Sequence, residues 1–474
     1  MGCVVVQLGQ GGNQMASAFF NALASLSHPA TASQDFFRDS STGEHIARAV
    51  LIDMEPKVVA AAMKRPCGSP LSNPGSWSYS QNRQVICDSG SGNNWARGFY
   101  VHGPRCRDSI LDIVRLEVEE CDRFGGFVTM QSMGGGTGSG LGTYISEALR
   151  DEYPSTCILS NCIWPHESGE VIVQSYNVLL TLSYLESLAD GIVILQNEGL
   201  TSICKKLLGI QRPSFDHMNE VAAESLVSVL LPAFWRPVEA TLSPQKENTH
   251  RLTHPIIQTG DNKPNNSGKF VASSHLHLLS DLVSVLCAHP AYRLLSLRFT
   301  PQVPPQSLDF TTFTWGAHMK QLRHMLTMGA WGDTDINWSA ALSTIASSTS
   351  KVSSQPGLRP TNRSVANLLI LRGNGSQHAD VNTFAHESLY PIWSVDPLNV
   401  AVNETKLGNY EMAAGLLSNC QSTVMPASRV LPRAYGMYSA RAYLHQYFEH
   451  GMDNSSFDAA FATVEDIVAR YLAL

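Results

Sequence analysis

The sequence predicts an α/β fold in which a parallel sheet, covered by helices, occupies roughly the first 200 residues. Short apolar runs of strand length alternate there with segments whose apolar residues recur at helical spacing. Because parallel strands need long crossover connections, this alternation is typical of a parallel, helix-covered sheet. Three glycine-rich loops also lie where a strand meets a helix, which is the edge at which such sheets bind ligands.

Each strand is predicted from an apolar run bounded by polar or glycine-rich residues. The runs, in chain order, are residues 3–8, 49–52, 127–131, 158–164 and 191–195. Helices are predicted between them, because apolar residues recur there every three or four positions. The apolar stripes of these helices lie within residues 15–26, 110–121 and 141–149.

The rest of the chain predicts a second ordered unit and a helical end. Helical spacing from Met218 to Leu230 indicates a long helix that ends near Pro232. The following 236–275 stretch has four prolines and no sustained period, which is typical of a surface insertion or linker. Strands are predicted at 294–299 and 368–371, and the last part of the chain is striped like a helix.

Composition excludes several classes of protein. A hydrophobic content of 43% supports sizeable cores, and only 15% charged residues is too few for a disordered or coiled-coil chain. A net charge of −7 disfavours nucleic acid as a partner. No apolar run reaches the roughly 18 residues of a membrane helix, and no secretory signal is visible, so no membrane partner is expected. The ten scattered cysteines, without a Cys-x-x-Cys pair, indicate reduced thiols.

The three glycine-rich loops are the strongest chemical signal. Loop 1 is Gly9-Gln-Gly-Gly-Asn-Gln14, loop 2 is Ser89-Gly-Ser-Gly-Asn-Asn-Trp95, and loop 3 is Gly134-Gly-Gly-Thr-Gly-Ser-Gly140. Glycine lets backbone N–H groups turn toward a phosphate, and the following helix N-terminus favours negative charge. Loop 3 is not a Walker motif because no lysine follows it, and Gln14 breaks the dinucleotide fingerprint in loop 1.

Without a loop lysine, the phosphate charge must be met by other groups. Backbone amides, Gln10, Thr137 and a metal ion are the candidates. Asp53 and Glu55 follow a predicted strand and supply carboxylates for a water-mediated Mg²⁺. The alternative interpretation of this pair is an acidic helix N-terminus.

These segments resemble the tubulin superfamily. Loop 3 is similar to its signature, while loop 1, residues 90–95 and Asp53-Met-Glu-Pro56 look like its other nucleotide loops. The resemblance runs nearly end to end, since residues 441–447 and 449–453 look like the C-terminal helices of the family. Val101-His-Gly-Pro-Arg105, Met54-Glu-Pro-Lys57, Thr311-Thr-Phe-Thr-Trp315 and Ile163-Trp-Pro165 resemble the delta class within it.

The resemblance implies a tubulin-like fold with a parallel-sheet GTP-binding domain, a smaller second α/β domain and C-terminal helices. The expected divisions are the GTP-binding domain at 1–215, a connecting helix at 216–235, an insertion at 236–275, an intermediate α/β domain at 276–385 and a C-terminal helical region at 386–474. It also implies GTP or GDP as ligand, with Mg²⁺ near Glu55 and Asp53. The phosphate residues that it implies are Gln10, Gly11, Gly12, Ser91, Gly92, Asn93, Ser132, Gly134, Gly135, Gly136, Thr137, Gly138, Ser139 and Gly140.

The nucleoside side of the site is also implied by the resemblance. Asn197 and Asn219 match the asparagines that read the guanine edge, and an amide suits an edge with both donors and acceptors. Phe215 falls where tubulins usually place a tyrosine over the base, and its ring can still stack. Glu170 falls at the ribose-side position. Gln174 replaces an acid that is common there.

Hydrolysis in this family uses an acidic residue from the subunit stacked above. The matching position here is Asp281, which points away from the apolar face formed by Leu279, Leu282, Val283 and Leu286. An ordinary solvated carboxylate is the alternative interpretation. The resemblance therefore allows a GTPase whose reaction is completed in trans.

The implied role is that of a cytoplasmic, cytoskeletal GTP-binding protein at the centriole or basal body, acting on triplet microtubules and on cilium or flagellum assembly. Other tubulin-family subunits and centriolar proteins are the implied partners. The 236–275 insertion falls at a longitudinal contact of tubulins, and no acidic tail follows Leu474, so tail-directed motor docking is not expected. Two alternatives stay open, a soluble nucleotide-dependent enzyme with a self-contained site and a bacterial-type division GTPase.

Overall fold

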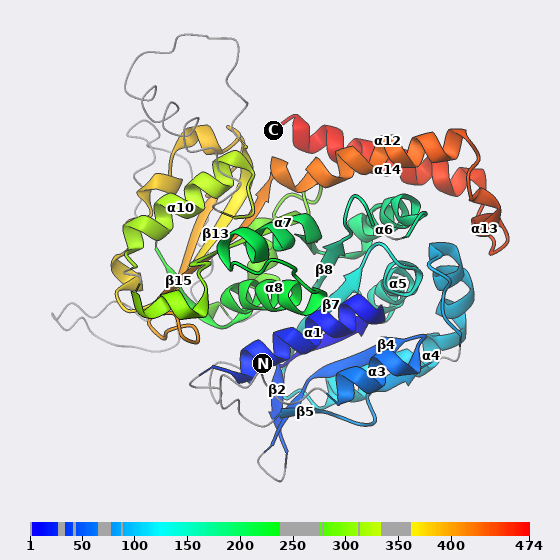
Figure 1. The fold of residues 1–474 in the computed structure, drawn as a ribbon, viewed down its shortest axis with the longest axis horizontal. Coiled ribbons are helices and arrows are strands. Elements are labelled where there is room, and N and C mark those ends of the chain that lie inside the picture. Colours follow the sequence, from blue (N-terminus) through cyan, green and yellow to red (C-terminus); the bar gives the residue numbers. More distant parts are fainter. Residues whose placement is uncertain are drawn as a thin grey trace.

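A computed structural model shows a mixed sheet of twelve strands flanked by helices (Figure 1). It describes residues 2–26, 34–40, 44–64, 77–86, 89–169, 171–237, 275–276, 279–310, 313–332 and 362–474. The strand order is β11-β10-β14-β13-β15-β12-β9-β8-β7-β1-β4-β6. The prediction of an α/β fold is confirmed.

The N-terminal half of the sheet is parallel throughout. Its strands are β1 (Gly2–Leu8), β4 (Ala49–Asp53), β6 (Gln84–Ile86), β7 (Phe124–Ser132), β8 (Ile158–Trp164) and β9 (Gly191–Gln196). All five predicted strands are present, because long apolar runs suit strands buried on both faces. The short β6 and a small second sheet were not predicted; the latter comprises β2 (Phe37–Asp39), β3 (His45–Ala47) and β5 (Trp77–Tyr79).

Helices cover both faces of this parallel half. On one face α1 (Gly9–Ala24) packs beside α8 (Phe215–Leu230), and β1 contributes Cys3 and Val5 to the same core. On the other face α4 (Gly103–Glu119) and α5 (Gly142–Glu152) pack on Val4 and Val6. Alternate residues of β1 thus point to opposite cores. The further helices of this half are α3 (Pro56–Met63), α6 (Gln174–Leu188) and α7 (Asn197–Ser202).

The second half of the sheet joins the first through β12 (Leu294–Thr300), which pairs in parallel with β9 and antiparallel with β15. The other strands here are β10 (Ala233–Arg236), β11 (His275–Leu276), β13 (Ser364–Gly373), β14 (Leu398–Asn403) and β15 (Met412–Cys420). Its helices are α9 (Leu279–Leu286) and α10 (Trp315–Met328). Both predicted strands of this unit are present.

Two expectations for this half are corrected. The 236–275 stretch has regular structure at both ends. Its first residue is the last of β10, its last residue is the first of β11, and these two strands pair with each other. Residues 238–274 lie outside the described part. The 386–474 region is not helical throughout, because it contributes β14 and β15 to the sheet. These strands pair with β13, a long-range contact that no local pattern records. The exact domain boundaries stay predictions.

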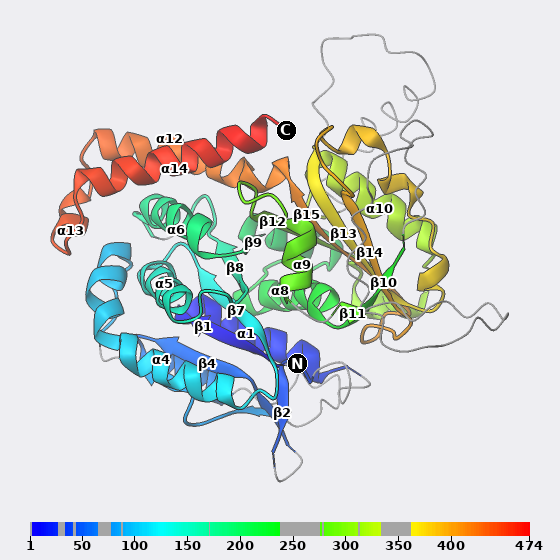
Figure 2. The ribbon, with the colours of Figure 1, turned by 180° about the vertical axis from the view of Figure 1, so that it is seen from behind.

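The C-terminal helices begin at α12 (Met425–Ser439) and continue through α13 (Leu444–Phe448) and α14 (Asn454–Leu472). In Figures 1 and 2, α12 and α14 lie side by side over α6. Tyr176 of α6 meets Tyr447 and Phe457 there, with ring centroids 5.5 and 5.1 Å away. This aromatic cluster joins the C-terminal helices to the parallel sheet.

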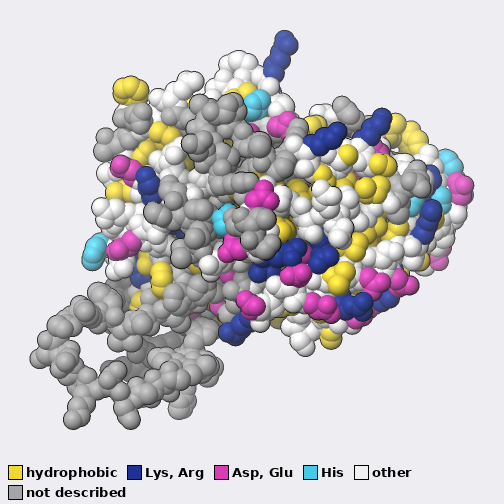
Figure 3. Space-filling model, turned by 90° about the horizontal axis from the view of Figure 1, so that it is seen from below, with side chains coloured by type: hydrophobic (Ala, Val, Ile, Leu, Met, Phe, Trp, Pro, Cys, Tyr) yellow, Lys and Arg dark blue, Asp and Glu magenta, His cyan; other side chains and the backbone are white. Residues whose placement is uncertain are grey.

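Three further observations concern the described helices, the cysteine thiols and the charges on one face. Within the described ranges, no helix combines the length and apolar character that crossing a membrane requires. The described cysteines are free thiols, as predicted for them. On the face drawn in Figure 3, acidic and basic side chains are interspersed, so neither sign dominates the part that is described.

Candidate functional site

Loops 1 and 3 meet at the carboxyl ends of β1 and β7, which are neighbours in the sheet. Gly9 begins α1 with a positive φ of 71°, and a Cβ there would lie 2.7 Å from the backbone nitrogen of Gly138. A Cβ on Gly11 would come within 3.0 Å of the Cβ of Ser132. Glycine is therefore needed because the two loops touch through their backbones.

Loop 2 completes the same site from the side. A Cβ on Gly136 would lie 2.6 Å from the backbone nitrogen of Asn94 and 2.8 Å from the Cβ of Ser91. The hydroxyl groups of Ser91 and Thr137 form a hydrogen bond of 3.0 Å. The structure thus brings all three predicted phosphate loops together.

The remaining predicted phosphate residues lie within this interlocked set. A Cβ on Gly12 or Gly140 would overlap the backbone of β7 or of loop 2, and the Ser139 hydroxyl donates to the carbonyl of Gly135. Neither α1 nor the helical turn at Thr137–Leu141 has a side chain that caps its start. Their first N–H groups are therefore free to bind an anion, and the helix dipole favours one there.

Asn177 holds these loops together, and sequence reasoning missed it. Its buried amide nitrogen donates to the carbonyls of Asn93 and Gly134, each at 2.8 Å. Its amide oxygen accepts from the backbone nitrogen of Trp95 at 3.1 Å and from the hydroxyl of Tyr447 at 2.7 Å. The available signal was an asparagine directly before the apolar run Val178–Leu180 of α6, since a buried amide needs partners.

The predicted metal ligands lie at the end of β4. One carboxylate oxygen of Asp53 accepts from the backbone nitrogens of Met54 and Glu55, at 2.7 and 3.3 Å. The other oxygen is buried without a partner, and burial raises the pKa of Asp53 to about 6. Glu55 is exposed and lines a cavity of about 300 Å³ together with Gln10 and Gln14.

This donor set fits a hard cation only with help from other ligands. No cluster of three His, Cys, Asp or Glu side chains able to hold a metal occurs in the described ranges. Mg²⁺ typically takes one or two carboxylates and completes its shell with phosphate oxygens and water. The orphaned oxygen of Asp53 and the free carboxylate of Glu55 match that partial role beside a phosphate site.

The predicted base-reading residues lie on neighbouring helices at the same sheet edge. Asn197 is the first residue of α7, directly after β9, and Asn219 lies on α8; both are buried. The two helices pack together, and the hydroxyl of Thr201 contacts the sulfur of Met218 at 3.0 Å. Phe215 begins α8 with 60% of its surface exposed, so its ring is free to stack on a planar ligand.

The ribose-side predictions have a different outcome. Glu170 lies outside the described residues. The amide nitrogen of Gln174 donates to the carbonyl of His166 at 2.7 Å, so this group holds the chain segment that follows β8.

Asp281 lies away from this site. It is half-buried on α9, whose first residue, Leu279, would contact a Cβ on Gly126 at 3.2 Å. Gly126 is near the start of β7, whereas loop 3 follows its end at Ser132. At the usual rise per strand residue, these points are about 20 Å apart. Asp281 therefore cannot reach the phosphate loops of its own chain.

The fold and the site indicate a nucleotide-binding α/β protein, with the predicted phosphate loops at the carboxyl edge of a parallel sheet and buried amides beside them. The model of the Tubulin/FtsZ family GTPase domain matches residues 2–205. The chain is 37% identical to the "Tubulin delta chain" of Macaca fascicularis and to that of Homo sapiens. In each case the alignment covers 100% of this chain and 100% of the relative. It is 25% identical to the "Tubulin beta-8 chain" of Oryza sativa subsp. japonica, over 98% of this chain and 93% of that one. The chain belongs to the tubulin family.

Family membership confirms the recognised resemblance and the fold class. This chain is a GTP-binding member of the family that resembles delta-tubulin. Because the chain matches tubulin chains over its full length, the tubulin interpretation replaces those of an unrelated nucleotide-dependent enzyme and a bacterial-type division GTPase. Whether the active site is complete within one chain stays a prediction. The roles of individual site residues and the Mg²⁺ ion stay predictions.

Proposed function

We propose that this chain is a delta-type tubulin that acts in the cytoplasm, at the centriole or basal body. There it binds GTP and contributes to triplet microtubules and to the assembly of cilia or flagella. Other tubulin-family subunits, together with centriolar proteins, are its partners. The identity of 37% over the whole length of delta chains supports this role.

The observation that carries the biochemical part is the contact among the three glycine-rich loops. Their backbones touch at Gly9, Gly136 and Gly138, which leaves N–H groups at one sheet edge for the phosphates. Glu55 and Asp53 hold Mg²⁺ against the phosphates. Asn197 and Asn219 read the base, Phe215 stacks on it, and Glu170 binds the ribose.

Hydrolysis, in this proposal, is completed by a stacked subunit. The site gathers groups that bind phosphate, while Asp281 lies about 20 Å away along the sheet. When this chain is the upper subunit, Asp281 faces the nucleotide of the chain below and orients the attacking water. When it is the lower subunit, its partner supplies the acid.

Two experiments test the proposal. Nucleotide released by denaturing the purified protein should be GTP or GDP by chromatography and mass spectrometry; NAD, or no nucleotide, would contradict it. Depletion of the chain from ciliated cells should remove the third tubule of centriolar triplets in electron micrographs. Intact triplets after complete depletion would exclude the centriolar role.

A further inference from the structure

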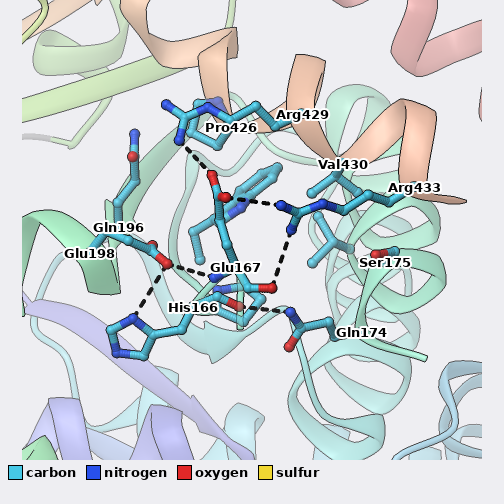
Figure 4. A pocket seen from close by; sticks show the side chains of 13 residues that line it. His166, Glu167, Gln174, Ser175, Gln196, Glu198, Pro426, Arg429, Val430 and Arg433 are labelled. Atoms are coloured by element: carbon cyan, nitrogen blue, oxygen red, sulfur yellow. Dashed lines mark hydrogen bonds and ion pairs between the residues drawn. The ribbon is translucent and has the colours of Figure 1, made fainter. Parts of the chain in front are cut away.

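The segment 165–169, which leaves the end of β8, is bound to the outer helix α12 (Figure 4). The two carboxylate oxygens of Glu167 pair with Arg429 at 2.6 Å and with Arg433 at 2.9 Å. The guanidinium of Arg433 also donates to the backbone carbonyl of Glu167 at 3.2 Å. The two arginines are four residues apart and therefore share one face of α12.

The same segment is also bound to the nucleoside side of the site. The backbone nitrogen of Glu167 donates to the carboxylate of Glu198 at 2.5 Å, and that carboxylate lies 3.4 Å from Nδ1 of His166. Glu198 directly follows Asn197, the predicted base-reading residue, in the first turn of α7. A continuous polar network thus runs from α12 through Glu167 to the start of α7.

A simple alternative is that the pair fastens α12 to the domain. That helix is already held by apolar contacts, because its residues Ala427 and Ala434, together with Val424 directly before it, lie in the core shared with α6 and α14. The segment, by contrast, has no fully buried residue from 165 to 169. Its position therefore depends on polar contacts far more than the position of α12 does.

The chemistry of the network suits positioning. The hydrogen bond from Arg429 lowers the pKa of Glu167 most, and the hydrogen bond from Arg433 lowers it further, so this pKa lies below its usual range. The carboxylate thus stays ionised while it pairs with both arginines. Exposed ion pairs contribute little to stability, but a carboxylate shared by two guanidinium groups strongly restricts geometry.

We propose that Glu167 is a positioning residue that couples α12 to nucleotide binding. This inference rests on the proposed function, because it takes Asn197 as a base-reading group and the segment before Glu170 as the ribose side. With the network intact, the segment stays closed over the nucleoside and slows its release. By linkage, bound nucleotide also strengthens the contact of the segment with α12.

The test compares Glu167→Gln with Glu186→Gln in the full-length protein. Glu186 is a matched control, because its carboxylate also pairs with an arginine of the C-terminal helices. It lies on α6 and pairs with Arg470 of α14 at 2.8 Å. It lies near the far end of α6, about 18 Å from Gln174 at the usual helical rise. The probe is GDP with a fluorescent label on its ribose, and its dissociation is followed by stopped flow.

Glu167→Gln should accelerate dissociation by about fivefold or more, which is the lower range of typical coupling, while Glu186→Gln should match the wild type. Arg429→Gln with Arg433→Gln should give the same acceleration, and adding Glu167→Gln to this pair should change nothing further. Hydrogen exchange in residues 425–433 should slow on GDP binding in the wild type but not in Glu167→Gln.

The outcomes separate the two proposals. A wild-type protein that binds no guanine nucleotide would overturn the nucleotide site itself. If the wild type binds but Glu167→Gln releases GDP at the wild-type rate, the coupling is refuted. Equal acceleration by Glu186→Gln would refute it too, because the effect would then reflect a general loosening of the C-terminal helices.

Discussion

The amide oxygen of Asn177 accepts a hydrogen bond of 2.7 Å from the hydroxyl of Tyr447, which lies 270 residues further along the chain. The same side chain donates to loops 2 and 3. Asn94 of loop 2 likewise donates to the carbonyl of Gln446, at 3.0 Å. The short helix α13 therefore forms part of the support of loops 2 and 3.

Replacing Asn177 by alanine should weaken GTP binding much more than replacing Tyr447 by phenylalanine. The first change leaves several buried backbone groups unpaired, at about 1–3 kcal/mol each, and the second removes one hydroxyl worth about 1 kcal/mol. Titration calorimetry with GTP should show a loss of roughly tenfold or more for Asn177→Ala. Equal losses for both variants would show that the contacts to the loops carry no special weight.

Asn219→Ala should reduce affinity for GTP more than any residual affinity for ATP. The buried amide is predicted to pair with the guanine edge, and losing such a pair costs about 1–3 kcal/mol, roughly tenfold in affinity. Competition of GTP and ATP against a fluorescent guanine nucleotide measures both affinities in one assay. A parallel decrease for the two nucleotides would rule out base reading by this residue.

Gly136→Val should abolish nucleotide binding, because its Cβ would lie 2.6 Å from the backbone nitrogen of Asn94. Folding should suffer as well, since bound nucleotide stabilises the native state. Gly436→Ala is the matched control, since a Cβ there meets no atom within 4 Å on the exposed face of α12. It should stabilise the protein by about 0.4–1 kcal/mol and leave GTP binding unchanged. Unchanged affinity in Gly136→Val would contradict the role of loop 3.

Asp53 should make the stability of the nucleotide-free protein depend on pH. Burial raises its pKa from 3.8 to about 6, so the folded state holds this proton more tightly than the unfolded state. Its contribution to stability is therefore complete below the unfolded pKa and is lost as the pH rises through 6. Asp53→Asn should remove that dependence and raise the free energy of unfolding near pH 7 by about 3 kcal/mol.

Urea titrations of both proteins across this pH range isolate the effect of Asp53 as a difference. A constant difference at every pH would show that the carboxyl keeps its ordinary pKa. In the presence of GTP, Asp53→Asn should also need more Mg²⁺ for full binding, because one proposed ligand is missing.

GTP hydrolysis per chain should rise with protein or partner concentration. A dilute monomer holds the phosphates without an acid to orient water, and such a general base typically contributes about 10²–10⁴-fold. Asp281→Ala should remove the rise only where this chain is the upper subunit. Rates are measured across a dilution series of wild type and variant, with and without a tubulin partner. Rapid, concentration-independent hydrolysis would show that the site is complete in one chain.

The sequence alone determined five of the six strands in the parallel half of the sheet and the positions of the three glycine-rich loops. Apolar runs such as 158–164 are long enough to identify central strands, and glycines between a strand and a helix mark backbone that must approach a ligand or another loop. Each glycine-rich loop could be located because its residues are consecutive in the chain, and the structure shows that the three loops meet. Their binding of phosphate stays a prediction.

Only the tertiary structure decided how distant segments complete the site. β14 and β15 pair with β13, Asn177 joins loops 2 and 3 to α13, and Glu167 meets arginines 262 and 266 residues away. It also placed Asp281 at the opposite edge of the sheet from the phosphate loops. Periodicity reports which face of an element is apolar, whereas these hydrogen bonds and ion pairs depend on where the chain returns, which no local pattern encodes.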